Sequence, residues 1–250
     1  MRILAALLLL HFLPACRTTT KEVNPPCAGF DVAHSDARAI AIADSVMEAL
    51  GGRAAWDTSR CVQWKFAGKR TLCWDRFTND FRLDDGARVV LMNLVTGQGL
   101  VFEGGAELVR DGDKRREQLD KAHKIWVNDS YWLFAPYKLK DSGVTLTWRR
   151  EDKLDDGRAV DVLRVEFDGV GVTPDNAYDV WVARDTHLVE KWSYYKWKTD
   201  SDPAMTTPWS GWKRYGRIML ASDHGTGGPA TNEIIVYDEP PARLHDAALP

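Results

Sequence analysis

The chain has 250 residues, a formal net charge of −3 and eleven tryptophans. This charge argues against nucleic acid as a partner, because proteins that bind phosphate backbones usually carry a clear basic excess. We expect residues 35–240 to form a single domain, since that length is enough for one large hydrophobic core.

The first residues have the pattern of an export signal. Arg2 is basic, residues 3–13 form an almost unbroken apolar run, and residues 13–16 (Leu-Pro-Ala-Cys) form a short cleavage site. The apolar run is too short to span a membrane as a helix, which needs about 20 residues. The cleavage site resembles the lipobox of bacterial lipoproteins, in which the signal is removed just before an acylated cysteine. We therefore expect residues 1–15 to be a lipoprotein signal peptide and Cys16 to carry a lipid anchor, with an ordinary signal cut elsewhere as the alternative.

Residues 16–34 are interpreted as the lipidated N-terminus and a flexible tether, because they are polar, contain Pro25 and Pro26 and show no lasting periodicity. Arg17 follows the cysteine, at the position where aspartate is associated with retention in the inner membrane of enterobacteria. An outer-membrane position facing the periplasm is therefore favoured, for a protein that is exported and lipid-anchored to the bacterial envelope.

One helix opens the predicted domain. Ser35 is typical of an N-cap, and apolar residues then recur at helical spacing until Gly51 and Gly52 end the helix. Residues 53–57 are expected to form a short turn that directs Trp56 inward.

Alternating apolar residues predict a hairpin between residues 61 and 75. In antiparallel register, pairing Val62 with Leu72 places Cys61 opposite Cys73. These two cysteines are therefore a disulfide candidate in an oxidising compartment.

Further strands are predicted on both sides of a helical interruption. The other predicted strands are residues 79–83, 87–95, 99–103, 144–148, 163–167, 178–182, 188–198, 211–221 and 233–238. Between them, residues 113–127 predict a helix, and residues 128–130 (Asn-Asp-Ser) could cap a second, short helix over residues 131–134, which Pro136 ends. Because a long meander usually curls, we predict an α+β fold: a strongly curved antiparallel sheet of about 10–12 strands, forming a half-open β-barrel, with the N-terminal helix and a mid-chain helical plug on its concave side. Residues 241–250 are expected to be a C-terminal tail.

No catalytic pattern rises above background. The chain lacks a G-x-S-x-G elbow, an H-E-x-x-H motif, a P-loop and a dinucleotide-binding fingerprint, so no catalytic residue is predicted and we expect the protein not to be an enzyme. It also lacks a C-x-x-C pair and histidines at metal-ligand spacing, so neither a metal nor a cofactor is expected. Cys27, outside the candidate pair, is expected to be free or to compete for one of the other cysteines.

The aromatic content stands out instead. Packing of the core and of sheet faces explains many of the tryptophans. Residues 188–198, however, carry Trp192 and Tyr194 on one face and Tyr195 and Trp197 on the other. One of those faces must be covered, form a binding surface or line a cavity. Large apolar cavities with a few polar anchors are the usual form of a small-molecule site.

Two stretches carry a family resemblance. Residues 126–139 (WVNDSYWLFAPYKL) and residues 50–60 (LGGRAAWDTSR) look like motifs of poorly characterised lipoprotein-sorting-like proteins. With the lipobox, the N-terminal helix, the long curved sheet and the helical plug, the chain resembles the periplasmic lipoprotein-carrier superfamily. That superfamily includes the outer-membrane lipoprotein-sorting proteins and the related mycobacterial lipid carriers. The resemblance implies a half-open barrel, apolar inside and closed by helices, that holds acyl chains, and it assigns no ligand residue position by position.

If the barrel holds a ligand, we expect its walls to come from strand faces and from the helical plug. The candidate ligand-binding residues are Trp64, Trp74, Leu91, Phe102, Trp126, Tyr131, Trp132, Phe134, Trp148 and Phe167, with Asn128 and Asp129 as polar residues at the mouth. For the last two, capping of the short helix is the alternative interpretation.

The resulting hypothesis is a membrane-anchored bacterial envelope lipoprotein that binds or carries an apolar ligand, either a lipid or an acylated protein. One alternative is a structural or regulatory lipoprotein of the same fold that binds an envelope protein partner. A third, an envelope hydrolase, would need polar residues that converge in a pocket only after folding.

Overall fold

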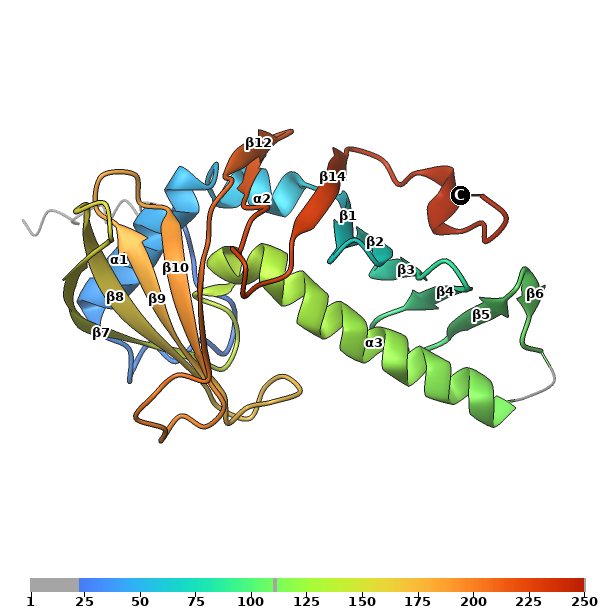
Figure 1. Ribbon diagram of the computed structural model, residues 1–250, viewed down its shortest axis with the longest axis horizontal. Coiled ribbons are helices and arrows are strands. Elements are labelled where there is room, and N and C mark those ends of the chain that lie inside the picture. Colours follow the sequence, from blue (N-terminus) through green and yellow to red (C-terminus); the bar gives the residue numbers. More distant parts are fainter. Residues whose placement is uncertain (1–22, 110–111, 250) are drawn as a thin grey trace, which may run out of the picture.

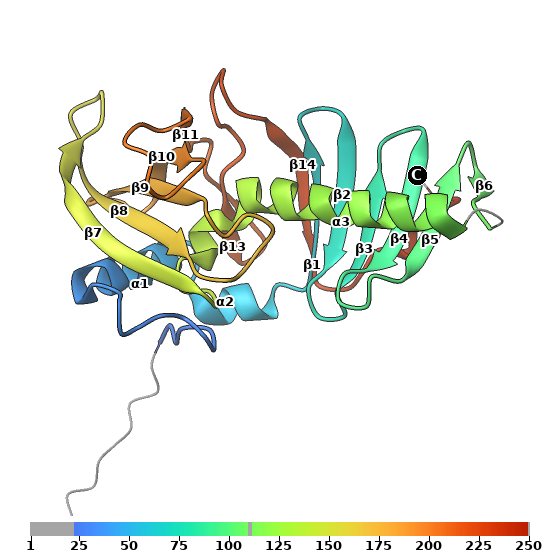
Figure 2. The same ribbon diagram turned by 90° about the horizontal axis from the view of Figure 1, so that it is seen from below.

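The computed structural model describes residues 23–109 and 112–249. Figures 1 and 2 show two sheets side by side, connected by one long helix. The helices are α1 (Ala37–Ala49), α2 (Arg53–Thr58), α3 (Gly112–Phe134) and the 3₁₀ helices η1 (Ala135–Lys138) and η2 (Ala242–Leu244). The strands are β1 (Cys61–Phe66), β2 (Arg70–Asp75), β3 (Asp80–Asp84), β4 (Arg88–Asn93), β5 (Gly99–Glu103), β6 (Ala106–Glu107), β7 (Val144–Lys153), β8 (Ala159–Phe167), β9 (Ala177–Ala183), β10 (Val189–Tyr195), β11 (Met205–Pro208), β12 (Lys213–Tyr215), β13 (Ile218–Leu220) and β14 (Thr231–Tyr237).

The strands form two main antiparallel sheets. Sheet A has seven strands in the order β14-β1-β2-β3-β4-β5-β6, and sheet B has five in the order β11-β10-β9-β8-β7, while β12 and β13 form a separate hairpin. The predicted α+β class with a curved antiparallel sheet is confirmed, but the strands form two main sheets rather than one, and within the described ranges neither sheet closes into a barrel. The strands are divided between two sheets because α3, with 23 residues, comes between β6 and β7 and carries the chain from the far end of sheet A to sheet B (Figure 2).

The N-terminal helix forms as predicted, but its start is stabilised differently. The buried residues of α1 are Ala39, Ala43, Val46 and Met47. Ser35 and Asp36 do not cap it with their side chains; both accept hydrogen bonds from backbone N–H groups of β7 (3.0 and 2.8 Å), and so attach the helix to that strand. At the other end, Gly51 has a φ of 115°, and a Cβ there would lie 2.4 Å from the carbonyl oxygen of Arg217. The predicted glycine stop is therefore confirmed.

The β1–β2 hairpin forms as predicted, but with another register. Val62 pairs with Trp74, so the prediction that paired Val62 with Leu72 is wrong by two residues. Ala67 and Gly68 both have positive φ, 50° and 66°, in the turn. With this turn, the midpoint of the hairpin lies further along the chain, nearer to β2, than the alternation of apolar residues indicates.

The two cysteines of the hairpin lie diagonally rather than opposite each other. Cys61 pairs with Asp75, and Cys73 pairs with Gln63. Both cysteines are buried free thiols on the same face of sheet A, with their sulfur atoms 3.5 Å apart. Their disulfide stays a prediction. Cys27 is also free and is half-buried.

The mid-chain helical segment is one continuous helix. α3 runs from Gly112 to Phe134, so the prediction of a second helix capped by residues 128–130 is wrong. Asp129 is buried, and its carboxylate accepts two hydrogen bonds from Arg70 of β2, with Nε–Oδ2 and Nη2–Oδ1 distances of 2.6 and 2.7 Å. Because Arg70 forms hydrogen bonds with the carboxylate of Asp129, this residue can be buried inside a helix, and the helix continues through residues 128–130.

Both terminal segments contact the folded part. Phe30 is buried and the N–H of Asp31 donates to the carbonyl oxygen of Val144 (3.0 Å), so part of the expected tether packs beside β7. The C-terminal segment covers the face of sheet A turned away from α3 (Figure 1), where buried Arg82 donates to three of its carbonyl oxygens at 2.7–2.8 Å. Residues 1–16, with the expected signal peptide and lipidated cysteine, lie outside the described residues. Among those described, none of the helices combines the length and the apolar character that a membrane crossing requires.

Candidate functional site

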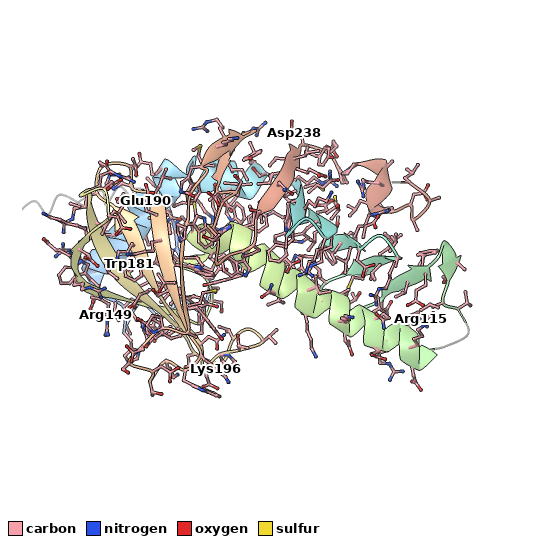
Figure 3. The ribbon with its side chains drawn as sticks, in the orientation of Figure 1. Arg115, Arg149, Trp181, Glu190, Lys196 and Asp238 are labelled. Atoms are coloured by element: carbon pink, nitrogen blue, oxygen red, sulfur yellow. The ribbon has the colours of Figure 1, made fainter. Side chains whose placement is uncertain are left out.

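A cavity of about 400 Å³ lies between the C-terminal half of α3 and sheet B. α3 supplies one wall, the strands β8 to β11 supply another, and the loop of residues 168–176 between β8 and β9, which projects toward α3 in Figure 1, forms a third. In Figure 3, the label of Lys196 marks the end of β10 and that of Arg115 marks the N-terminal end of α3. The lining residues are Lys124, Val127, Asn128, Tyr131, Trp132, Phe167, Val170, Gly171, Val172, Thr173, Asn176, Tyr178, Trp192, Tyr194 and Met205.

The interior of the cavity is lined by connected aromatic rings. We call this set the aromatic wall: Tyr131, Trp132, Phe167, Tyr178, Trp192 and Tyr194. Tyr178 lies at its centre, stacked on Trp192 with ring centroids 4.8 Å apart, 5.1 Å from Tyr131 and 5.5 Å from Tyr194. Because these rings contact one another, they form a continuous apolar surface.

Ordinary periodicity brings these rings together. On β10, Trp192 and Tyr194 are two residues apart and so share one face, and Tyr194 pairs directly with Tyr178 of β9. On α3, Val127 and Tyr131 are four residues apart and therefore lie on one helix face. The cavity forms where this helix face meets that sheet face.

The opening of the cavity is polar. Lys124, Asn128 and Thr173 are exposed there, and Val172 of the loop is 52% exposed. Asn176 is buried and donates from Nδ2 to Thr173 Oγ1 (2.7 Å), which fixes the bend of the loop. The site thus has apolar rings inside, and the ammonium group of Lys124 and the amide group of Asn128 at its opening. This arrangement matches an amphiphile, which has an apolar chain and a polar head group.

The interior carries no ionised side chain at neutral pH. Burial raises the pKa of Tyr131 well above its usual value, and burial together with the nearby Tyr194 raises the pKa of Tyr178. Both phenols therefore stay protonated. Of the lining residues only Lys124, at the opening, is charged. Within residues 23–109 and 112–249, no group of three or more His, Cys, Asp or Glu residues could hold a metal ion.

Some of the predicted ligand-binding residues line this cavity and others do not. Those that line it are Asn128, Tyr131, Trp132 and Phe167. Four more, Trp64, Trp74, Trp126 and Phe134, pack together between α3 and sheet A, with ring centroids 5.1 Å apart for Trp74 and Trp126 and 5.6 Å apart for Trp64 and Phe134. α3 thus fills the concave side of sheet A, where the sequence suggested room for a ligand.

Two predicted residues lie on the other face of sheet A. Val90 and Val101 are buried in the core, and side chains alternate along a strand. Leu91 and Phe102, each next to one of these valines, therefore face away from the core and do not line the cavity.

The remaining two predicted residues have structural partners elsewhere. Trp148 of β7 donates from Nε1 to Asp161 (2.8 Å), and the guanidinium of Arg38 lies 3.9 Å above its ring. Asp129 points to sheet A, where Arg70 binds it. Of the two polar residues expected at the mouth, only Asn128 is there.

Several lining residues were absent from the sequence-based candidates. Tyr178, Trp192, Tyr194 and Met205 come from sheet B. The aromatic residues on both faces of residues 188–198 are the signal that could have included two of them. The loop between β8 and β9 gives no signal, because its sequence is typical of an ordinary turn.

His224 is buried behind the aromatic wall. Its ring lies edge-on to Trp132 and Trp209, with centroids 5.2 and 4.7 Å apart, and its Nδ1 lies 3.0 Å from the carbonyl oxygen of Pro229. Burial lowers the pKa of this imidazole below its usual value. The neutral ring is therefore part of the packing that supports the wall.

We expect the free energy of unfolding to fall as the pH drops below about 6.5. The unfolded chain then binds a proton at His224 more readily than the folded chain does, so this contribution to stability is complete above that pH and decreases as the pH approaches the lowered pKa. Urea unfolding between about pH 7.5 and about pH 5 measures the effect. The pH dependence should be weaker in His224→Gln and unchanged in the exposed control His245→Gln; a wild-type profile in His224→Gln would contradict the assignment.

No protein-family model and no curated protein match the chain. Solved structures do match it. A DUF1329 family protein from Desulfovibrio piger is 14% identical, with 85% of this chain and 99% of that chain covered and a TM-score of 0.45. A LolA superfamily protein from Nitrosomonas europaea is 11% identical, with coverages of 83% and 99% and a TM-score of 0.34. The MucA/MucB complex of Pseudomonas aeruginosa matches at 15% identity, with coverages of 82% and 61% and a TM-score of 0.27. As expected from the sequence, the structures that this chain resembles include a LolA superfamily protein.

Proposed function

We propose that this protein is an exported lipoprotein of the bacterial envelope that binds the apolar chain of a lipid, or of an acylated protein, in the cavity beside α3. The cavity of about 400 Å³, with its aromatic wall and polar opening, is the observation that carries this proposal. Its volume falls within the range of about 300–1,000 Å³ that is usual for small-molecule sites.

An alkyl chain suits this lining. Each methylene group that moves from water into apolar contact contributes about 0.8 kcal/mol. The rings of the aromatic wall already contact one another and need no new hydrogen bonds to receive such a chain. A polar head group would stay at the opening, beside Lys124 and Asn128. Amphiphiles with one alkyl chain are therefore the first ligands to test.

A fluorescence titration tests the proposal. The chain with Cys16→Ser, which removes the expected acylation site, is titrated with hexadecanoate, and tryptophan emission is followed because Trp132 and Trp192 belong to the aromatic wall. We expect a saturable change that albumin, as a competing carrier, reverses. A protein that binds no fatty acid, phospholipid or hydrophobic dye above background would contradict the proposal.

The lipid anchor is a separate part of the proposal and is supported by the lipobox-like residues 13–16. Because each buried methylene of an acyl chain contributes about 0.8 kcal/mol, two or more chains on Cys16 would hold the protein firmly. Arg17 supports the outer membrane as the destination. We expect the wild type in the membrane fraction and Cys16→Ser in the soluble fraction, with the acyl groups identified by mass spectrometry of the N-terminal peptide. An unmodified wild-type peptide would contradict the anchor and leave the cavity proposal standing.

A further inference from the structure

A second space lies directly behind the aromatic wall. It is small, about 10 Å³, and it shares two lining residues with the cavity, Tyr131 and Trp192. The rings of these two residues therefore separate the two spaces. The rest of its lining is apolar and includes Ala135, Leu139, Val165 and Val180.

Trp192 is a fixed part of this partition. Its side chain is 3% exposed, its Nε1 donates to Thr207 Oγ1 (2.7 Å), and its ring is stacked on Tyr178. Moving this indole would break a buried hydrogen bond, which is costly when the groups left behind cannot reach water.

Tyr131 is held by ring packing alone. It lies near the end of α3, with its ring centroid 5.7 Å from that of Trp192 and 6.4 Å from that of Phe167, and neither pair is stacked. No residue in the described ranges forms a hydrogen bond with its hydroxyl. Of the two residues in the partition, Tyr131 is therefore the one that can be truncated without breaking a hydrogen bond.

Given the proposed function, on which this inference rests, we propose that Tyr131 sets the depth of the cavity and thereby the length of alkyl chain that the protein prefers. An alkyl chain enters past Lys124, and its methyl end goes in before its head group. At the inner end of the cavity this methyl end contacts the ring of Tyr131. Truncation of that ring joins the cavity to the apolar space behind it. The end of a longer chain then reaches Val165 and Val180.

The test uses the full chain with Cys16→Ser and saturated fatty acids from decanoate to octadecanoate. In Tyr131→Ala, and in the milder Tyr131→Leu, the affinity for octadecanoate relative to the best wild-type ligand should rise about 15-fold. This is the effect of two further buried methylene groups at about 0.8 kcal/mol each. The matched control Tyr131→Phe keeps the ring and should keep the wild-type preference.

An unchanged chain-length preference in a folded Tyr131→Ala or Tyr131→Leu protein overturns the inference, and so does the same shift in Tyr131→Phe. Thermal unfolding shows which variants fold, and Tyr131→Leu provides the result if the alanine variant does not. Failure of the proposed function gives a different result, because the wild type would then bind none of the fatty acids. That result would contradict both the proposed function and the role of Tyr131.

Discussion

Replacing Asp129 with alanine should lower the free energy of unfolding by about 3 kcal/mol. Asp129 is fully buried within α3, and Arg70 binds both of its carboxylate oxygens. Without the carboxylate, the guanidinium of Arg70, which is 24% exposed, loses its partner. Removing one member of a buried ion pair costs about 3–5 kcal/mol, and the partial exposure of Arg70 places the effect at the lower end. Urea unfolding measures the change, which is large beside a total stability of about 5–15 kcal/mol.

The same helix offers a matched control for this variant. Asp113 and Arg116 form an exposed ion pair in the first turns of α3, with N and O 3.9 Å apart, so Asp113→Ala should change stability little. The double variant Arg70→Met with Asp129→Leu removes both charges together and should recover most of the loss. If Asp129→Ala destabilised the protein no more than Asp113→Ala does, the ion pair would not be what holds α3 to sheet A.

This ion pair also matters for the cavity, because α3 serves both sheets. Asp129 and Trp126 face sheet A, where they contact Arg70 and Trp74. Tyr131, on another side of the same helix, lines the cavity against sheet B. The contacts with sheet A therefore fix the position of α3, which forms one wall of the cavity, while sheet B forms the wall that faces it.

The sequence predicts this fold best where neighbouring residues decide the structure. Gly51 ends α1 as expected, because only a residue without a Cβ fits beside the carbonyl of Arg217. The alternating residues of β1 and β2 form the expected hairpin. Both features depend on a few residues close together in the chain, and local patterns describe them well.

Local patterns fail where a distant residue decides. Residues 128–130 are typical of a helix start, and Arg70, 59 residues earlier in the chain, makes it possible to bury Asp129 in a helix interior. The hairpin register fails for a related reason. The alternation of apolar residues is the same after a shift of two, so only the conformation of the turn distinguishes the two registers.

The sequence predicts only part of the candidate site, and the rest is missed for the same physical reason. The sequence pattern assigns the aromatic residues of the mid-chain segment to one helical plug beside the ligand, whereas a helix has several faces. Trp126 packs against Trp74 of sheet A, and Trp132 packs against Trp192 of sheet B. Which face of α3 meets which sheet depends on the division of the strands into two sheets, and no local pattern shows that division.

Filling the cavity at Val127 should lower the affinity for hexadecanoate about 60-fold. Val127 is half-buried on α3 and lines the cavity. In Val127→Trp, an indole would occupy space that about three methylene groups of a ligand need, and each methylene left in water loses about 0.8 kcal/mol of binding free energy. The fluorescence titration with hexadecanoate measures the change.

The control is Lys121→Trp, which adds the same indole to an exposed position of the same helix outside the cavity lining. Both variants should unfold at nearly the wild-type temperature, because neither replaces a fully buried residue. A difference in affinity between them therefore reports on the cavity rather than on the stability of α3. If Val127→Trp and Lys121→Trp bind hexadecanoate equally well, the alkyl chain binds outside the aromatic wall, and the cavity is not the site of the proposed function.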